Sequence, residues 1–176
     1  MNPVELLVQI IKRHAPENIW IGSPVADYRK LGNTNRGEIG EEFVRQYLKQ
    51  STIEVKRGSR TALFDAGIST TRLEIKTASL GVNRTFQFNH VRLDRTYDFL
   101  LCLGICPKDI VFQMWRKGDV AEGKAGKLVK MAESQSVTFK LTKRLAVMRP
   151  IQELPDEIRK HLEPAEIIVT NPPTSN

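Results

Sequence analysis

The sequence has few cysteines and no long hydrophobic run, and both shortages exclude classes of protein. None of its apolar stretches approaches the roughly 20 residues that a membrane-spanning helix requires. Its two cysteines, Cys102 and Cys106, lie in one apolar run that is not a zinc-binding pattern, so we expect two buried thiols. The first residues carry an acid, Glu5, where a secretory signal peptide carries basic residues, which predicts a cytoplasmic protein.

The sequence also lacks internal repeats, long linkers and the nucleotide-binding pattern G-x-x-x-x-G-K-[S/T]. A chain of 176 residues is long enough to bury about two thirds of the surface that it exposes when unfolded. Its hydrophobic share of 40% and charged share of 27% are typical of globular proteins. We therefore expect one domain over residues 1–165, followed by a flexible C-terminal tail over 166–176.

Positive charge is in excess, with a formal net charge of +7 and an isoelectric point near 9.6. This balance favours a polyanionic partner such as nucleic acid. The basic residues are spread over several segments, and no single patch dominates. Charge alone therefore does not decide between a nucleic-acid-binding protein and one whose charge only keeps it in solution.

Residues 4–14 and 36–50 have the apolar periodicity of helices, and the turn-rich segment 18–35 connects them. Asn35 is a suitable N-cap for the second helix, and Glu38 follows three residues later, as in a capping box. The first helix carries an apolar stripe, and the stripe of the second is expected to face the core.

After this second helix the apolar period changes from 3.6 to about 2, which is typical of strands. Residues 121–130 indicate an exposed basic loop or short helix, and 155–162 a short helix. Helix, mixed sheet and further helix in this order predict an α/β or α+β fold, with a mixed β-sheet flanked by helices. The expected strands are 52–56, 62–68, 72–77, 85–91, 97–105, 110–115 and 136–141.

Charged residues interrupt two of these strands, where charge is costly unless it is paired or bound to a metal. Asp65 lies in one strand, and the triplet Glu74-Ile75-Lys76 lies in the next. Of two further Glu-x-Lys triplets, the one at 54–56 has no aspartate shortly before it, and the one at 122–124 lies in a Gly-rich segment with no strand pattern. Only the triplet at 74–76 follows an aspartate across a tight turn, because residues 69–71 can close a hairpin.

Strand alternation places Glu74 and Lys76 on one face of the sheet. Asp65 and Glu74 could then bind one hard cation, to which the main-chain carbonyl of Ile75 could add an oxygen. Lys76 would lie beside them, able to orient or deprotonate an attacking water or to stabilise charge on phosphorus. The plainer alternative is an ion pair on a solvated strand, with Asp65 as a cap at the strand end.

Glu41 lies at the rim of the apolar stripe of the helix predicted over 36–50. A glutamate at that position can look toward the sheet and join a metal site. The alternative is an ordinary surface acid beside the stripe, and for Glu38 capping is a sufficient explanation. The stripe comprises Ile39, Phe43, Val44, Tyr47 and Leu48.

These motifs, in their order along the chain, resemble the PD-(D/E)XK nuclease superfamily. That superfamily includes type II restriction endonucleases, Holliday-junction resolvases and several repair nucleases. The resemblance covers about residues 36–115 and rests on three segments, 36–44, 64–66 and 73–77. It is carried by their order: a helix with a glutamate, an aspartate, then Glu-x-Lys and a hydrophobic strand.

The resemblance implies a restriction-endonuclease-like core and a metal-dependent nuclease site. Asp65 and Glu74 would bind Mg²⁺, for which Mn²⁺ could substitute, Lys76 would be the catalytic lysine, and Glu41 would support the metal site. One departure is that residues 62–64 precede the aspartate without the proline of the family name. Members of the superfamily often lack this proline, so the departure weighs little.

A chain of this size without an ATP-binding signature suits a type II restriction endonuclease that cuts double-stranded DNA. Two strands need two cuts, so we expect a homodimer. Arg84 and Arg92 could contact DNA phosphates or face solvent. His90 could be a general base or a structural residue. The residues expected to reach bases or phosphates are Arg84, Gln87, Asn89, His90, Arg92, Lys124 and Lys127.

Two other functions fit the same motifs. A structure-specific or repair nuclease, such as a Holliday-junction resolvase, would use the same residues on branched DNA. A non-catalytic DNA-binding domain could keep the scaffold without the activity, although the intact set of Asp65, Glu74 and Lys76 argues against it.

Overall fold

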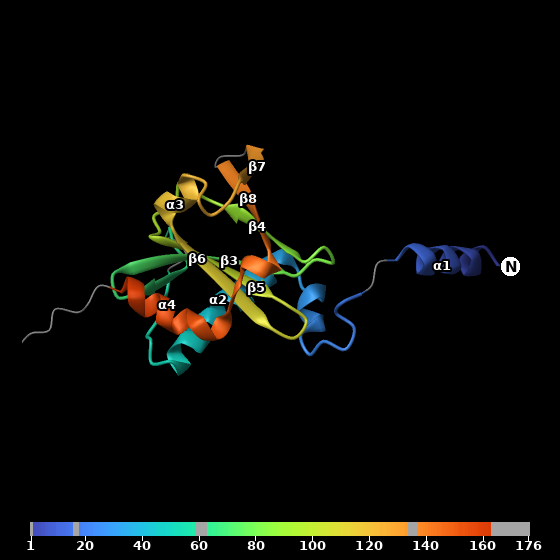
Figure 1. The fold of residues 1–176 in the computed structure, drawn as a ribbon, viewed down its shortest axis with the longest axis horizontal. Helices are drawn as coiled ribbons and strands as arrows, with labels where there is room; N and C mark the ends of the chain where they lie inside the picture. The colour runs from blue at the N-terminus through green and yellow to red at the C-terminus, as the bar shows by residue number, and fades with distance from the viewer. Residues whose placement is uncertain (1, 16–17, 59–62, 134–136, 163–176) are drawn as a thin grey trace, which may run out of the picture.

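The computed structural model describes residues 2–15, 18–58, 63–133 and 137–162, which form a mixed α+β structure (Figure 1). The tail expected over 166–176 lies outside the described residues. The α-helices are α1 (Pro3–His14), α2 (Asn33–Gln50), α3 (Lys117–Ala121) and α4 (Leu154–His161). The strands are β1 (Lys56–Arg57), β2 (Ala66–Ile68), β3 (Thr71–Ser79), β4 (Thr85–Val91), β5 (Phe99–Ile105), β6 (Ile110–Arg116), β7 (Leu128–Glu133), β8 (Val137–Arg144) and β9 (Arg149–Pro150).

The larger sheet is mixed, as predicted, with the strand order β1-β2-β3-β5-β6-β9. Its central strands β3 and β5 run parallel, with Glu74 opposite Leu100 and Lys76 opposite Cys102, and the other pairs are antiparallel. Every residue of β5 is buried. A strand covered on both faces has no polar side to alternate with, which explains the unbroken apolar run in the sequence.

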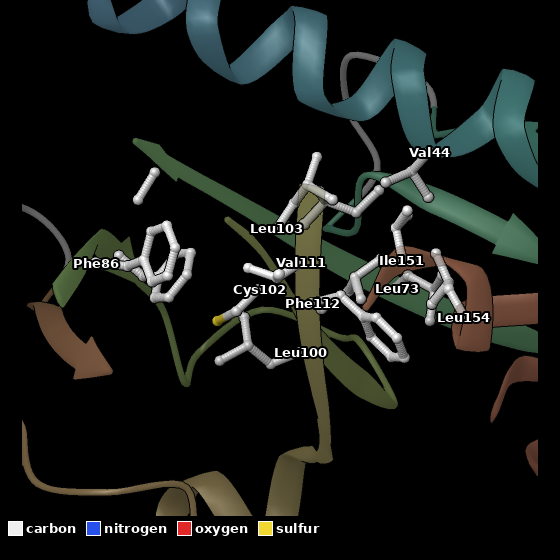
Figure 2. Close-up of a cluster of buried hydrophobic side chains, with 14 of the residues drawn as sticks. Val44, Leu73, Phe86, Leu100, Cys102, Leu103, Val111, Phe112, Ile151 and Leu154 are labelled. Atoms are coloured by element: carbon white, nitrogen blue, oxygen red, sulfur yellow. The ribbon is translucent and has the colours of Figure 1, made fainter. Parts of the chain in front are cut away.

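Different layers cover the two faces of this sheet. Thr77 of β3 touches α2, and the ring of His161 of α4 lies 4.7 Å from that of Phe99, so both helices cover one face. The opposite face meets a second sheet of order β4-β8-β7, because a Cβ at Gly104 would lie 2.8 Å from the ring of Phe86 on β4. Figure 2 shows this core, to which α2, α4 and strands of both sheets contribute.

Helix α2 approaches β3 unusually closely at Gly40. A Cβ built at this glycine would overlap the side-chain hydroxyl of Thr77. Glycine weakens a helix by about 1 kcal/mol relative to alanine, so its presence here reflects the need for a close approach. This contact fixes the position of the next residue, Glu41, relative to the strand that carries Glu74.

Two expectations for this helix are wrong. It begins at Asn33 after the N-cap Gly32, with no side-chain cap, so the capping box of Asn35 and Glu38 does not form. The chain enters the helix directly from a short 3₁₀ turn at Ala26–Lys30, which leaves Asn35 inside the first turn. In the predicted stripe Val44 and Leu48 are buried, but Ile39 is 44% exposed because the helix packs through Gly40 instead.

The hairpin β2–β3 forms as predicted, with Ile68 opposite Thr71 and the two residues Ser69 and Thr70 in its turn. Its first strand begins only at Ala66, and Leu63 to Asp65 are bends rather than strand. The predicted strand 52–56 is reduced to β1, Lys56–Arg57. Strand β2 does not begin before Ala66, because the side chain of Asp65 takes the place of a main-chain acceptor for the N–H of Ile75 on β3.

The segment 121–130, predicted as an exposed basic loop or short helix, is neither throughout. It holds the end of α3, a turn with Gly123 and Gly126 at positive φ, and the start of β7. The strand predicted at 136–141 is β8, Val137–Arg144, and the helix at 155–162 is α4. Position 136 lies outside the described residues.

Helix α1 forms as predicted but buries no residue. Its apolar stripe through Leu6, Leu7, Ile10 and Ile11 is exposed, and the helix stands apart from the rest of the chain in Figure 1. Among the described residues, no helix combines the length and the apolar character needed to cross a membrane.

Candidate functional site

The β2–β3 hairpin brings together the acids that the sequence singled out. Directly beyond the paired residues, the main-chain N–H of Asp65 donates to the carbonyl of Leu73 at 2.9 Å. The carboxylate of Asp65 then accepts from the main-chain N–H of Ile75, with Oδ2 at 2.8 Å. This bond stops the strand ladder and holds the Asp65 carboxylate beside the Glu-x-Lys triplet.

The same bond indicates where the Ile75 carbonyl points. In an extended strand the N–H and C=O of one residue point to the same side. The Ile75 carbonyl therefore points into the gap where β2 has ended, on the side of the Asp65 carboxylate. This direction suits the oxygen-ligand role expected for Ile75.

Glu74 is fully buried, which rules out the alternative of an ion pair on a solvated strand. Burial raises the pKa of its carboxyl group, while the charges of Lys76 and Arg95 oppose that rise. Its Oε1 lies 2.5 Å from Nζ of Lys76, and its Oε2 lies 2.7 Å from Nη1 of Arg95. A buried carboxylate is tolerated only with such partners, so the cluster functions as a unit.

Lys76 projects from the same face of β3 as Glu74, as the strand alternation predicted. Its ammonium contacts Glu74 closely but lies 4.0 Å from Oδ2 of Asp65. The side chain is 18% exposed, so the ammonium lies at the border between the buried carboxylate and solvent. A substrate oxygen can therefore reach it.

Arg95 is the site residue that the sequence reasoning missed. Its Nη1 lies 2.7 Å from Oε2 of Glu74 and 3.2 Å from Oδ1 of Asp65. It comes from the loop between β4 and β5, far from the hairpin in sequence, and no motif of the sequence singles it out. A charge count carries a signal for it: two acids in buried strands, with Lys76 alone, leave one negative charge without a partner.

The carboxylate of Glu41 is close enough to the site for its charge to interact with the charges of Asp65 and Lys76. Its pKa is raised by burial first and by the nearby charge of Asp65 second, while Lys76 and Arg57 oppose the rise. It comes from α2, where the contact between Gly40 and Thr77 sets its position. A surface hollow lined by Glu38, Glu41 and Arg57, among others, gives solvent access to this side.

The residues expected to contact DNA fall into two places rather than one patch. Arg84, Gln87, Asn89 and His90 are exposed along or beside β4, and Arg92 follows that strand with its guanidinium paired to Asp94 at 2.6 Å. Arg84 and His90 have positive φ, and His90 lies at an irregularity of the β4–β8 ladder.

Lys124 and Lys127 form the second place, between α3 and β7. Both are exposed, but Lys124 pairs with Asp119 at 3.1 Å and with Glu122 at 2.8 Å. Its charge is therefore offset within the look-alike triplet 122–124. Arg92 lies on the same loop as Arg95, which contacts Asp65 and Glu74, so the end of β4 leads toward the acids.

The donor set of the cluster fits a divalent cation. Oxygens of Asp65 and Glu74 converge on one positively charged atom, Nη1 of Arg95, and the Ile75 carbonyl points toward the same gap. No group of three or more His, Cys, Asp or Glu side chains gathers at one point in the part of the chain that is described. Magnesium is commonly held by one or two carboxylates together with water and substrate phosphates, so two acids suffice.

Comparisons with known proteins add no relative to this picture: neither a scan against protein-family models nor a search of curated proteins found a match for the chain.

Proposed function

We propose that this protein is a Mg²⁺-dependent DNA endonuclease of the PD-(D/E)XK type with a restriction-endonuclease-like core. The observation that carries the proposal is the convergence of Asp65 and Glu74 on one cation position, with the Lys76 ammonium 2.5 Å from Glu74. The mixed sheet with its parallel pair β3–β5, covered by α2, supports the fold assignment. The net charge of +7 supports a nucleic acid as substrate.

In this function Asp65, Glu74 and the Ile75 carbonyl hold the cation. When bound, Mg²⁺ neutralises charge on the phosphoryl group and lowers the pKa of a water molecule. Lys76, which has only donors, hydrogen-bonds the phosphate oxygen or the attacking water and so orients the reacting groups. Glu41, on the α2 side of the acids, would accept hydrogen bonds from water at the site and so keep that water in place.

The substrate is proposed to be double-stranded DNA, cut at a specific sequence by a homodimer in the manner of a type II restriction enzyme. Digestion of unmethylated phage DNA with Mg²⁺, and with EDTA in its place, tests this directly. Discrete bands that require Mg²⁺ support it. Cutting of a four-way junction without discrete bands from linear DNA would instead identify a structure-specific nuclease of the same fold.

Lys76→Ala is expected to reduce cleavage by about 10²–10³-fold, because it removes a donor aimed at developing negative charge. Lys124→Ala is the matched control, since Lys124 belongs to the look-alike triplet 122–124 but is exposed and already paired with acids. It should cleave like the wild type. Single-turnover cleavage with excess enzyme measures both.

If the cleavage rate fell equally in both variants, Lys76 would have no special role in the reaction. The absence of any Mg²⁺-dependent cutting of linear, branched or single-stranded DNA by the wild type would overturn the nuclease proposal. In that case DNA binding by gel shift would identify the remaining function, a non-catalytic DNA-binding domain.

A further inference from the structure

Arg95 occupies the position where the two acids converge. A single nitrogen, Nη1, contacts both Asp65 and Glu74, and the side chain is 22% exposed. Without it the only cation that pairs with Asp65 among the described residues would be the Lys76 ammonium, 4.0 Å away. The guanidinium is thus the group that balances the second acid.

The arginine is incompletely satisfied in this place. Its Nε is buried and has no hydrogen-bond partner among the described residues. An unsatisfied buried donor costs about 1–3 kcal/mol, so the guanidinium is held by charge rather than by a complete set of hydrogen bonds. A planar group with five donors that uses Nη1 for both contacts is not in an optimal arginine–carboxylate geometry.

The main chain of Arg95 is held in place by a neighbouring lysine, whereas its side chain can rotate away from the acids. The ammonium of Lys117 donates to the carbonyl of Arg95 at 2.5 Å and lies over the ring of Tyr97 at 5.3 Å. The loop is thereby tied to the start of α3. Since the side chain reaches solvent, rotation about its own bonds is enough to move the guanidinium away from the acids.

We propose that Arg95 is an exchangeable internal counter-ion that competes with the divalent cation for Asp65 and Glu74. This inference rests on the part of the proposed function that places a cation at Asp65 and Glu74. It does not depend on the proposed cleavage of DNA. A cation held at about 2.1 Å from these oxygens cannot share the position with a guanidinium, because two positive groups would be in contact. Arg95 therefore stabilises the metal-free protein and sets the cation concentration at which the site fills.

The test is Mn²⁺ binding without DNA, followed by electron paramagnetic resonance, for the wild type and Arg95→Gln. Loss of the competing charge should tighten binding by about tenfold, as expected for a neighbouring charge that shifts a site equilibrium by one or more decades. Arg95→Lys keeps the charge and should bind Mn²⁺ nearly as the wild type does. Lys124→Gln is the control, because it also removes one positive charge, but one that pairs with Asp119 and Glu122 rather than with the site.

Thermal unfolding gives a second readout. Arg95→Gln should melt below the wild type in EDTA and gain more from added Mg²⁺, since the cation replaces the missing counter-ion. Asp65→Asn in either background should abolish Mn²⁺ binding.

Binding that is unchanged or weaker in Arg95→Gln would overturn the inference and make Arg95 a structural partner of the acids. No Mn²⁺ binding by any variant would overturn both the inference and the nuclease proposal. Tighter binding by Arg95→Gln in a protein that cuts no DNA would support the inference while the nuclease proposal failed, so the two can be distinguished.

Discussion

At the scale of single residues, two acids of the site are removed from water, although a carboxylate is most stable when it is hydrated. Glu74 is fully buried and Glu41 lies partly buried near Asp65. The pKa of each is raised, with burial as the largest cause. Residues that are placed in this way cost stability in the folded protein, which is common where a side chain is kept for chemistry rather than for packing.

Glu41 offers a direct measurement of this cost. Its pKa is raised in the folded protein above its ordinary value of 4.5, so the folded state binds protons more tightly and stability falls as the pH rises through that window. The penalty is fully present at neutral pH. Glu41→Gln should therefore melt above the wild type at pH 7 in EDTA, and the difference should disappear below pH 4.5.

Glu38→Gln is the control for this experiment, because Glu38 is exposed on the same helix. Its melting temperature should follow the wild type at both pH values. A lower melting temperature of Glu41→Gln at pH 7 would show that the carboxylate makes a favourable contact in the metal-free protein, contrary to the expectation.

Arg95 shows why residue-level prediction from sequence was incomplete. Asp65, Glu74 and Lys76 lie within one hairpin, so local spacing was enough to bring them together. Arg95 reaches them from a loop whose position depends on the pairing of β5 with β3. Long-range packing of this kind leaves no local pattern in the sequence.

At the scale of elements, the contact between α2 and β3 sets the geometry of the site. Thr77 cannot move aside, because it is a β-branched residue in a central strand with its hydroxyl buried. Gly40 therefore cannot be replaced without displacing the helix that carries Glu41.

Gly40→Ala should destabilise the protein by about 2 kcal/mol, because overpacking costs more than the helix propensity of alanine returns. Gly37→Ala is the matched control on the same helix, since a Cβ there would meet nothing within 4 Å. It should stabilise the protein by about 0.5–1 kcal/mol. Urea unfolding of both variants measures the difference, and a stabilised Gly40→Ala would contradict the close packing.

The presence of α2 and of strands β3 to β6 could be predicted from period and turn chemistry, although β2 begins only at Ala66 and β7 was not expected. The strand predicted over 85–91 matches β4, and the turn predicted over 69–71 forms at Ser69 and Thr70. The pairing partners of the strands could not be predicted, because alternation identifies a strand but not the strand that lies beside it. Strand β4 pairs with β8 through contacts such as Phe88 opposite Leu141, which are far apart in sequence.

At the scale of the whole molecule, the excess of positive charge is distributed so that only part of it is available to a polyanion. Lys124 is offset by two acids, while Arg92 is paired with one, Asp94, and lies on the loop that also carries Arg95. Position in the fold, rather than the number of basic residues in a segment, therefore separates candidate phosphate contacts from paired surface charge.

Arg92→Gln should weaken DNA binding, uniformly across sequences, and reduce the dependence of log K on log salt by about 1, as expected when one phosphate contact is lost. Lys124→Gln should leave both quantities unchanged. Fluorescence anisotropy with Ca²⁺ in place of Mg²⁺, at several salt concentrations, measures them. If both variants bound DNA equally weakly, the net charge of the protein, rather than the position of Arg92, would determine DNA binding.

The buried thiol of Cys102 has a consequence of another kind. This residue lies opposite Lys76 in the central strand pair, and burial raises the pKa of its thiol. A thiol reagent in neutral solution can reach it only after the layer that covers this face of the sheet has moved away, so its rate of modification reports how often the core beside Lys76 opens. The chain thus contains its own chemical probe of this opening, without any added label.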